Sequence, residues 1–511
     1  MIYLIIILYL VNNFLALKLN IHIFQLNYYR PDVQMKWLSK NYLQFLIIFI
    51  INIVQVYLLI KKLSLIFSVI LLLVNIYLMI EKNVVKKIVF TNRVKRLYLT
   101  NYIVFCFLAL IFYKHYNYLV IIFFIINGLP TLYMILVNYI NLPINKLINN
   151  YYVNDAKKKL KSMPNLKIIA ITGSYGKTST KDYVTKLLSS KYNVLNTPGN
   201  FNTLLGITRT IREELTPVHE VFVCEVGIDK VGEMEEIIKL IKPDYCMITA
   251  IGSQHLETFK TQENITNSKM KLLDGLKQDG IAFLNLDSEF INSYKITKDY
   301  IGYGLVNNKN NDLLLNNILY SSNGLSFDLT KEKEVYKVSS SLLGQHNLIN
   351  LYGAITVANK LEVPMKTIIN EVKHISNVDH RLKLIPGEKF SIIDDSYNSN
   401  PVGASNALKT LKQFDGFKIL MTPGMVELGN KQDEYNYNFG KEAATCSDYI
   451  YLINEEATKE IYNALKDEKY DLQKVKIFKT FKEAMDDVLK IETNGKHKYI
   501  LIENDLPDNY K

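Results

Sequence analysis

The stretch that decides the fold is Lys167–Ser179, KIIAITGSYGKTS, in which a short apolar run ends directly in a glycine-rich loop. The β-prone residues Lys167–Thr172 predict a strand, and a helical pattern follows the loop to about Ser190. Glycines let a backbone turn its N–H groups onto phosphate oxygens at the start of a helix. Lys177 and Thr178 are the residue types that contact β/γ-phosphates and Mg²⁺ in such loops. The stretch therefore predicts a nucleotide-binding α/β domain.

The full G-x-x-x-x-G-K-[ST] pattern is not met, because Ile171 stands where its first glycine would be. The shorter G-x-x-G-K-T form, placed between a clear strand and a clear helix, still favours a phosphate-binding loop over an incidental turn. The residues expected to contact the nucleotide here are Gly173, Ser174, Tyr175, Gly176, Lys177, Thr178 and Ser179.

Further strands in the same region end in polar residues. Val221–Glu225 and Tyr245–Ala250 read as strands, and ligands of α/β sheets gather at the carboxyl ends of strands. Glu225, His255 and Lys269 are therefore candidate site residues. Each of them also has a structural interpretation. Glu225 can be an ordinary carboxylate at a strand end, His255 a structural histidine and Lys269 a solvated lysine.

The charge of the chain is distributed unevenly along its 511 residues, a length that corresponds to about three domains. Residues 1–150 hold 14 basic and 2 acidic residues, whereas the remainder is almost neutral at −1. The excess of positive charge lies in an apolar region, where it indicates membrane topology, and nucleic-acid binding is excluded. No pair of cysteines has C-x-x-C spacing, which argues against a zinc ribbon and for reduced thiols.

The N-terminal region, residues 1–145, predicts about five membrane helices, with four as the alternative. Its lysines and arginines gather in 81–100, which predicts that this segment and the region after residue 145 lie in the cytoplasm, as in a multi-pass membrane protein. No acidic residue marks an ion path, so an anchor is favoured over a transporter. The apolar runs are 2–17, 42–60, 64–80, 101–113 and 118–138.

The C-terminal region predicts a second α/β domain. After a β-rich insertion at about 300–340 and two helices, short strand candidates alternate with helical stretches, as in a compact Rossmann-like sheet. It has no G-x-G-x-x-G after its first strand, so it is not expected to bind a dinucleotide. The predicted fold class is an α-helical membrane region followed by α/β domains: a P-loop ATPase domain over 146–381 and a Rossmann-like domain over 382–511.

Many ordered blocks over about residues 150–511 resemble the Mur ligase family. They are the phosphate-loop stretch itself, TPGNFNTLLGI (197–207), FVCEVGIDKVGEM (222–234), ITAIGSQHLETF (248–259), NSKMKLL (267–273), GQHNLINLYGAITVA (344–358), DHRLKLI (379–385), DDSYNSNP (394–401) and PGMVELG (423–429). The resemblance is greatest to the member that adds D-alanyl-D-alanine to a UDP-linked muramoyl-tripeptide. It implies an ADP-forming amide ligase of peptidoglycan synthesis that works through an acyl phosphate, with a monomeric catalytic part.

The resemblance also assigns roles to single residues. Lys177 would contact the transferred γ-phosphate of ATP, and Lys177, Glu225, His255 and Lys269 form the implied catalytic set. Thr178 and Glu225 would hold one Mg²⁺, and His255 with a carbamylated Lys269 would hold a second. The other implied nucleotide contacts are His346, Asn347, Arg381 and Asp395, and the implied substrate contacts are Asn200, Asn202, Asn398 and Asn400.

The N-terminal region departs from the family pattern, in which a small α/β domain grips the UDP group. Membrane helices stand there in this chain, so either a UDP-linked acceptor is held by the remaining domains or the acceptor is linked to membrane lipid. Two other classes stay open: a membrane-anchored ligase of another polymer, as in poly-γ-glutamate synthesis, and a membrane-tethered nucleotide switch. Retention of Glu225, His255 and Lys269 argues against a switch, which needs only the phosphate loop.

Overall fold

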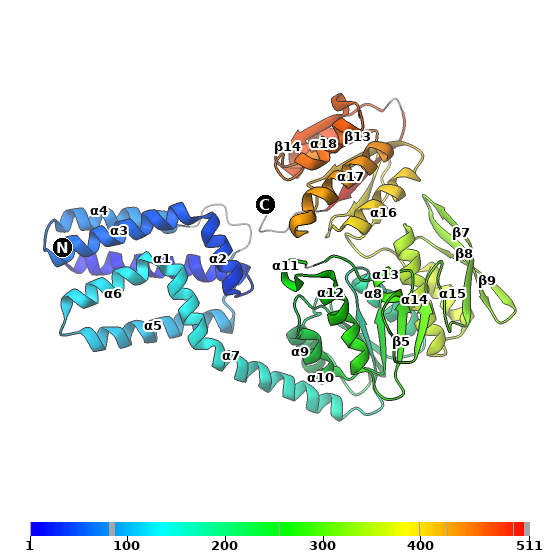
Figure 1. Cartoon of the computed structure of the whole chain (residues 1–511), viewed down its shortest axis with the longest axis horizontal. Coiled ribbons are helices and arrows are strands. Elements are labelled where there is room, and N and C mark those ends of the chain that lie inside the picture. The colour runs from blue at the N-terminus through cyan, green and yellow to red at the C-terminus, as the bar shows by residue number, and fades with distance from the viewer. Residues whose placement is uncertain are drawn as a thin grey trace. The chain divides into compact units, whose positions relative to one another are not determined.

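A computed structural model describes residues 2–80, 87–254, 256–397, 399–426, 428–493 and 495–504 of the chain. The chain divides into two compact units, Met1–Tyr151 and Tyr152–Lys511. The first unit is all-helical, and the second contains the three sheets (Figure 1).

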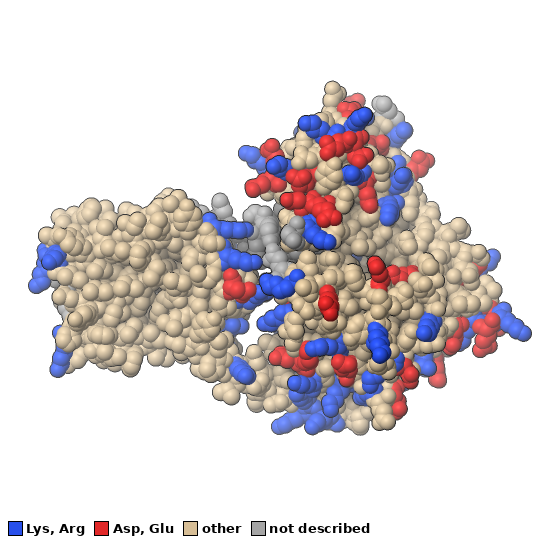
Figure 2. Space-filling model, viewed as in Figure 1, with Lys and Arg blue, Asp and Glu red and all other residues tan. Residues whose placement is uncertain are grey.

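The described residues of the first unit form helices with strongly apolar outer faces. Charged side chains lie toward its two ends, and the middle of the face shown in Figure 2 is free of them. The last helix, α7, continues into the second unit, where Ala156 is fully buried. The helices are α1 (Ile2–Leu26), α2 (Pro31–Lys40), α3 (Tyr42–Ile60), α4 (Leu65–Met79), α5 (Asn92–Phe112), α6 (Tyr116–Gly128) and α7 (Pro130–Lys161).

Three helices in the described part of the chain are long and apolar enough to cross a membrane, and up to four if the bent pair α6–α7 counts as one span. The sequence predicts five, with four as the alternative, whereas the structure offers candidates for three or four. The run at 64–80 forms a helix of 15 residues, about 22 Å long, which is short of a hydrocarbon core of about 30 Å. The run at 118–138 is interrupted by a 95° bend, because Pro130 has no N–H to continue the hydrogen bonding of α6.

The central domain is built on a parallel sheet of six strands in the order β2-β3-β1-β4-β5-β6. Because side chains alternate across a strand, Ile169 and Ile171 pack on one face, and Ile168 and Ala170 on the other. Both faces are covered by helices, as the near-continuous apolar strands require. The strands are β1 (Lys167–Thr172), β2 (Val194–Asn196), β3 (Val221–Glu225), β4 (Tyr245–Ile248), β5 (Ile281–Asn285) and β6 (Tyr300–Tyr303).

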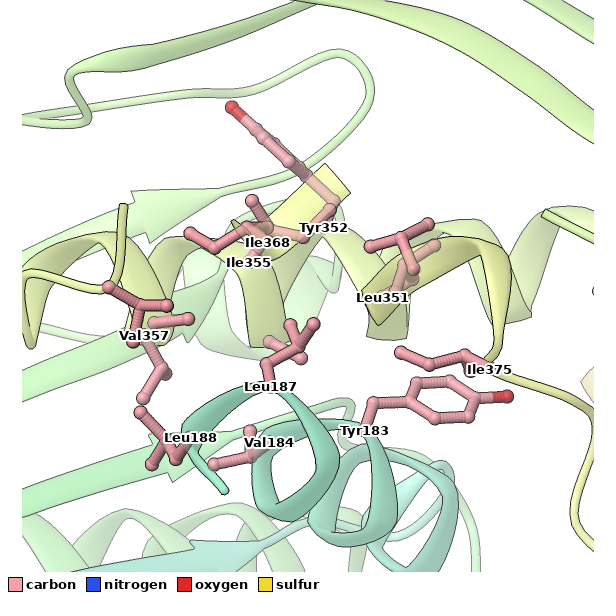
Figure 3. Packing of buried hydrophobic residues seen from close by; sticks show 14 of the residues in the cluster. Tyr183, Val184, Leu187, Leu188, Leu351, Tyr352, Ile355, Val357, Ile368 and Ile375 are labelled. Atoms are coloured by element: carbon pink, nitrogen blue, oxygen red, sulfur yellow. The ribbon is translucent and has the colours of Figure 1, made fainter. Parts of the chain in front are cut away.

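The helix after the phosphate loop, α8 (Lys177–Leu188), is fixed by an apolar contact with α14 (Gln345–Lys360) and α15 (Met365–Lys373). Figure 3 shows Leu187 of α8 directed at Ile355 of α14, and Val184 and Leu351 belong to the same buried cluster. All four side chains are fully buried. This packing holds the first turn of α8, and with it the loop, in a fixed place.

The rest of the central domain comprises shorter helices and the β-rich insertion that the sequence predicts. The insertion is a separate antiparallel sheet of three strands, β7 (Leu313–Ser321), β8 (Gly324–Lys331) and β9 (Glu334–Ser340). The remaining helices are α9 (Leu204–Glu213), α10 (Glu233–Ile241), α11 (Leu256–Phe259), α12 (Gln262–Met270), the 3₁₀ helix η1 (Lys271–Gly275) and α13 (Glu289–Asn292).

The C-terminal domain has its own six-stranded sheet in the order β10-β11-β15-β12-β13-β14. All of its neighbouring pairs are parallel except β10–β11. Together with the central domain this confirms the predicted α/β class. The strands are β10 (Lys383–Ile385), β11 (Phe390–Asp395), β12 (Phe417–Thr422), β13 (Tyr449–Ile453), β14 (Val475–Phe478) and β15 (Lys498–Glu503). The helices are α16 (Pro401–Lys412), η2 (Gly429–Lys431), α17 (Gln432–Cys446), α18 (Lys459–Asp467), η3 (Leu472–Lys474) and α19 (Phe481–Val488).

Candidate active site

The phosphate loop lies between β1 and α8, and two of its positions accept only glycine. Gly176, the N-cap of α8, has φ +79°, and a Cβ there would lie 2.6 Å from Oδ1 of Asn350. A Cβ on Gly173 would lie 2.1 Å from Oγ1 of Thr249. The left-handed backbone at Gly176 strains any residue with a side chain, and both contacts exclude one sterically. The loop is therefore packed from below by Thr249 and Asn350.

The loop is also tied to the segment that follows β4. The Ser174 N–H donates to the Ala250 carbonyl at 2.6 Å, and the Ser174 hydroxyl donates to the Gly252 carbonyl at 3.0 Å. Thr249 donates its hydroxyl to the Tyr175 carbonyl. These bonds hold the loop rigid, which is what a preformed phosphate cradle requires.

Lys177 lies over this loop. Its Nζ donates to the carbonyls of Gly173 at 2.9 Å and Ser174 at 3.2 Å. Burial lowers the pKa of its ammonium, while the negative charge of Glu225 opposes that shift. The ammonium of Lys177 thus lies where a phosphate group would contact the loop. Its present hydrogen-bond acceptors are neutral carbonyls, which an anion can replace.

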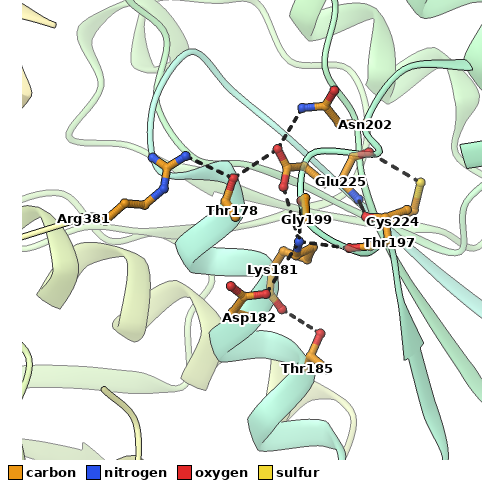
Figure 4. A network of polar contacts seen from close by, with 10 residues as sticks. All are labelled: Thr178, Lys181, Asp182, Thr185, Thr197, Gly199, Asn202, Cys224, Glu225 and Arg381. Atoms are coloured by element: carbon orange, nitrogen blue, oxygen red, sulfur yellow. Dashed lines mark hydrogen bonds and ion pairs between the residues drawn. The ribbon is translucent and has the colours of Figure 1, made fainter. Parts of the chain in front are cut away.

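The carboxylate of Glu225 is the centre of a polar cluster at the end of β3 (Figure 4). Its Oε1 accepts hydrogen bonds from Thr178 Oγ1 at 3.2 Å and from Asn202 Nδ2 at 3.0 Å. Its Oε2 is buried without a hydrogen-bond partner among the described residues. The structure therefore brings together Thr178, Glu225 and Asn202, as their predicted roles require.

Lys181 is a member of this cluster that the sequence reasoning missed. Its side chain is 2% exposed, and its Nζ lies 3.6 Å from Glu225 Oε2. The same ammonium donates to the carbonyls of Thr197 at 3.0 Å and Gly199 at 3.1 Å. It therefore joins α8, Glu225 and the loop that carries Asn202. The available signal was its position one helical turn after Lys177, which places both lysines on one face of α8.

Arg381 reaches the cluster from the start of the C-terminal domain. Its Nη2 donates to Thr178 Oγ1 at 3.4 Å, and its guanidinium lies 4.4 Å from the centre of the Tyr397 ring. A planar guanidinium with several free N–H groups is suited to phosphate oxygens. A cationic side chain of the second domain thus lies beside the phosphate loop of the first.

Lys269, on α12, contacts the loop at the same carbonyl as Lys177, that of Gly173. Its side chain is 1% exposed, and its Nζ donates to the Gly173 carbonyl at 3.0 Å. Burial, and after it the charge of Lys177, lower the pKa of its amine well below the ordinary value. The interpretation of Lys269 as a solvated surface lysine is therefore wrong for this chain.

Two of the predicted site residues, His255 and Asn398, lie outside the described residues. Within the described ranges, no group of three His, Cys, Asp or Glu side chains is gathered as a metal site. Near the loop, the carboxylate of Glu225 and the hydroxyl of Thr178 lie within hydrogen-bonding distance of each other and could both bind a metal ion. This is a small donor set, of the kind that Mg²⁺ uses when substrate phosphates and water complete its shell.

His346 and Asn347, the two nucleotide contacts implied at the start of α14, differ in their hydrogen bonding. His346 keeps Nδ1 buried without a partner, and burial, with the charge of Arg381, lowers its pKa to about 4. Asn347, in contrast, accepts from Tyr183 Oη at 3.1 Å and donates to the Leu343 carbonyl at 2.9 Å. In this structure its amide fixes α14 against α8.

The remaining predicted residues differ in their surroundings. Asn200 is exposed on the loop after β2. Asn400 is the N-cap of α16, where its Oδ1 accepts from the Gly403 N–H at 2.9 Å. Asp395 accepts from the Leu382 N–H at 3.0 Å, and burial raises its pKa to about 7. Asn400 and Asp395 thus have structural partners in this state of the molecule.

The geometry first defines a class. A rigid glycine-rich loop at the carboxyl end of a parallel sheet, with a lysine, a hydroxyl and a strand-end carboxylate around it, is the site of a P-loop nucleotide-binding protein.

Comparison with known proteins narrows the class of nucleotide-binding protein to a family. Residues 171–358 match the Mur ligase middle domain, and residues 380–502 match the Mur ligase glutamate ligase domain. The chain belongs to the Mur ligase family.

Individual relatives are similar over the same part of the chain. The UDP-N-acetylmuramoyl-tripeptide--D-alanyl-D-alanine ligase of Buchnera aphidicola subsp. Acyrthosiphon pisum is 30% identical over 326 residues, 63% of this chain and 70% of that protein. The ligase of the same name from Buchnera aphidicola subsp. Baizongia pistaciae is 30% identical over 55% of this chain, which spans only 61% of that relative's length. A crystal structure of MurF from Acinetobacter baumannii is similar with a TM-score of 0.62 and 25% identity, covering 70% of this chain and 77% of that one.

Proposed function

We propose that the chain is an ATP-dependent amide ligase of peptidoglycan precursor synthesis that adds D-alanyl-D-alanine to a muramoyl-tripeptide. The observation that carries the proposal is the cluster of Thr178, Glu225 and Arg381 beside the phosphate loop. It combines a nucleotide site with a cationic contact from a second domain. The names of the relatives supply the substrates, D-alanyl-D-alanine and a UDP-linked tripeptide.

The cluster fits a divalent cation. Glu225 Oε2 is a buried carboxylate oxygen without a hydrogen-bond donor, a state that costs free energy unless a cation is nearby. Lys181 supplies part of that charge at 3.6 Å, and Mg²⁺ would supply the rest. Thr178 and Glu225 would hold the ion, which neutralises negative charge on the phosphate oxygens when it is bound.

A second ion is proposed at Lys269. A neutral amine attacks the carbon of CO₂, forms an N–C bond and loses a proton, which gives a carbamate, a carboxylate-like ligand in place of a positive group. Lys269 meets the condition for this reaction, since it is buried and its pKa is lowered by burial and by Lys177. By the family resemblance, His255 would be a second ligand of this ion.

The reaction follows from these residues. The acceptor carboxylate attacks the γ-phosphorus of ATP, the bond to the β-phosphate oxygen breaks, and ADP leaves an acyl phosphate. The amine then attacks the acyl carbon, forms the C–N bond and loses its proton, and the C–O bond breaks to release phosphate. The loop N–H groups, Lys177 and Arg381 stabilise negative charge on the transferred group in both steps. Asn202, which donates a hydrogen bond to Glu225, would contact the muramoyl-tripeptide substrate.

We also propose that the first unit is embedded in the cell membrane and that the catalytic unit is cytoplasmic. The apolar helices and the excess of positive charge in residues 1–150 support this. Single cysteines placed at 87–90 in an otherwise cysteine-free chain should be labelled from the cytoplasm only. Labelling from outside intact cells would overturn the orientation.

The ligase proposal is tested with the full-length chain in detergent. ATP, UDP-N-acetylmuramoyl-tripeptide and D-alanyl-D-alanine should together give ADP, phosphate and the pentapeptide product, detected by mass spectrometry. Omission of either substrate should stop product formation, and Lys177→Met should abolish it. Phosphate release that never depends on an amine would overturn the ligase proposal. Activity only with a lipid-linked acceptor would assign the acceptor to the membrane.

A further inference from the structure

Two arginines of the first unit are directed into its helix bundle. Arg93 and Arg96 lie in the first turns of α5, and their side chains reach α7. Arg93 Nη2 donates to Asn138 Oδ1 at 3.4 Å, and Arg96 Nη2 donates to Asn145 Oδ1 at 2.9 Å. Between these two asparagines, Asn141 accepts from the hydroxyl of Thr100 at 3.2 Å. We call Arg93, Arg96, Asn138, Asn141 and Asn145 the arginine–asparagine cluster.

Among the described residues, no carboxylate pairs with the two guanidinium groups of the cluster, which bond to asparagines. Asp32 is the only acidic residue within residues 2–80 and 87–150, and it pairs with Arg30 at 2.7 Å. Arginine remains charged at any physiological pH. Two positive charges that are partly buried and unpaired are costly, and in a membrane protein such charges usually mark a functional site.

Several donors of the cluster are also without acceptors. Nε of Arg93, Nε of Arg96 and Nδ2 of Asn145 are buried and make no hydrogen bond within the described part of the chain. Asn145 itself is only 8% exposed. A buried donor that finds no acceptor costs about 1–3 kcal/mol. A hydrogen-bond acceptor that reached these three donor atoms would therefore stabilise the cluster.

A role in setting membrane orientation does not by itself explain the contacts of Arg93 and Arg96. Arginines that merely set orientation extend their charged ends into water, away from the bundle. Arg93 instead lies with its guanidinium 3.8 Å from the centre of the Tyr29 ring, and Arg96 is bonded to the buried Asn145. Both arginines are thus held in place by packing, as in a preformed site.

The surroundings of the cluster select the ligand. The guanidinium fork matches phosphate oxygens, which accept two hydrogen bonds from one arginine. On the same two helices, Leu99, Ile103 and Leu136 are more than half exposed, an apolar surface that acyl chains can cover. A phosphate group attached to acyl chains satisfies both features, whereas a free phosphate ion satisfies only the first.

We propose that the arginine–asparagine cluster binds the phosphate group of an anionic membrane lipid. The proposal rests on the membrane embedding of the first unit and is independent of the ligase reaction. Bound lipid would supply the acceptors and the negative charge that the cluster lacks. It would also fix α5 against α7 at one end of the bundle.

The test uses the full-length chain in nanodiscs of phosphatidylcholine, with or without phosphatidylglycerol, and modification of arginines by phenylglyoxal followed by mass spectrometry. Phosphatidylglycerol should slow modification of Arg93 and Arg96 about tenfold, the effect of a site that is nine-tenths occupied, and leave Arg30 little changed. Equal protection in phosphatidylcholine alone would overturn the proposal. Equal protection by inorganic phosphate in phosphatidylcholine nanodiscs would replace the lipid by a free ion.

A pair of variants removes the same charge at two places. Arg93→Gln/Arg96→Gln should abolish immobilisation of spin-labelled phosphatidylglycerol, whereas Lys61→Gln/Lys62→Gln, at two exposed lysines, should retain it. Equal loss in both would show diffuse surface attraction and refute a site. If the arginine variant does not fold, the wild-type protection experiment decides alone. Failure of the wild-type chain to enter nanodiscs would overturn membrane embedding and this proposal together, while ligase activity in detergent would be unaffected.

Discussion

Replacement of Lys269 distinguishes two possible roles of this residue, that of a metal ligand and that of a buried structural side chain. Within the described part of the chain, its Nζ makes one hydrogen bond, to the Gly173 carbonyl, which also accepts a hydrogen bond from Lys177 at 2.9 Å. Lys269→Ala therefore leaves no carbonyl without a donor. What it removes is the volume of the side chain and, on the proposed mechanism, the carbamate.

The two losses have different sizes and different readouts. Truncation of a long buried side chain to alanine costs about 2–5 kcal/mol of the free energy of unfolding, and the lower end is expected because the Gly173 carbonyl keeps a partner. Loss of a ligand to the catalytic metal should lower turnover on the order of 10²-fold or more, a barrier of roughly 3 kcal/mol. A stability cost alone leaves turnover of the folded fraction unchanged.

The assay compares three variants by phosphate release and by chemical denaturation. Lys269→Ala should be severely defective and partly restored by acetate or formate, which can occupy the vacated space and supply a carboxylate. Lys269→Met fills that space, so it should be nearly as stable as wild type, equally inactive and not restored. Lys271→Ala, at a half-exposed lysine paired with Glu235, should be close to wild type. An unimpaired Lys269→Ala enzyme would refute the metal-site assignment.

Three other changes test the site and the C-terminal domain. Lys181→Met breaks the buried ion pair with Glu225 and should lower the free energy of unfolding by about 3–5 kcal/mol, measured by denaturant titration. Lys186→Met replaces a half-exposed lysine of the same helix and should have little effect. Gly176→Ala adds a clash to a left-handed strain of about 1–2 kcal/mol and should weaken binding of a fluorescent ATP analogue at least about tenfold. Gly199→Ala, at φ +50° with nothing within 4 Å of the added Cβ, isolates the strain and should weaken binding less. Burial raises the pKa of Glu503 to about 8, so the folded state holds the proton more tightly than the unfolded state, and stability should fall as pH rises from about 4.5 to 8. Glu503→Gln should flatten that dependence in thermal denaturation, and an unchanged pH profile would contradict the assignment.

Much of the site could be predicted because strand ends in a parallel sheet meet at one edge. The bounds of β1 and β3 agree with the runs seen in the sequence, and Thr178 and Glu225 are in hydrogen-bonding distance as expected. Asn400 shows the limit of this reasoning. Its position in a family block implied substrate binding, which stays a prediction, and the structure adds that it caps α16, a role that any asparagine before a helix can take.

The sequence by itself determined the local elements: the strand–loop–helix around Gly173–Ser179, the apolar helices and the division of charge between the two parts of the chain. These depend on neighbours along the chain, through the periodicity of apolar residues and the freedom of glycine. Only the tertiary structure decided that Lys181 and Lys269 are buried and that α6 and α7 meet at a bend. The physical reason is that burial and pairing arise from residues distant in sequence. A lysine on a polar helix is therefore solvated or buried according to what packs against it.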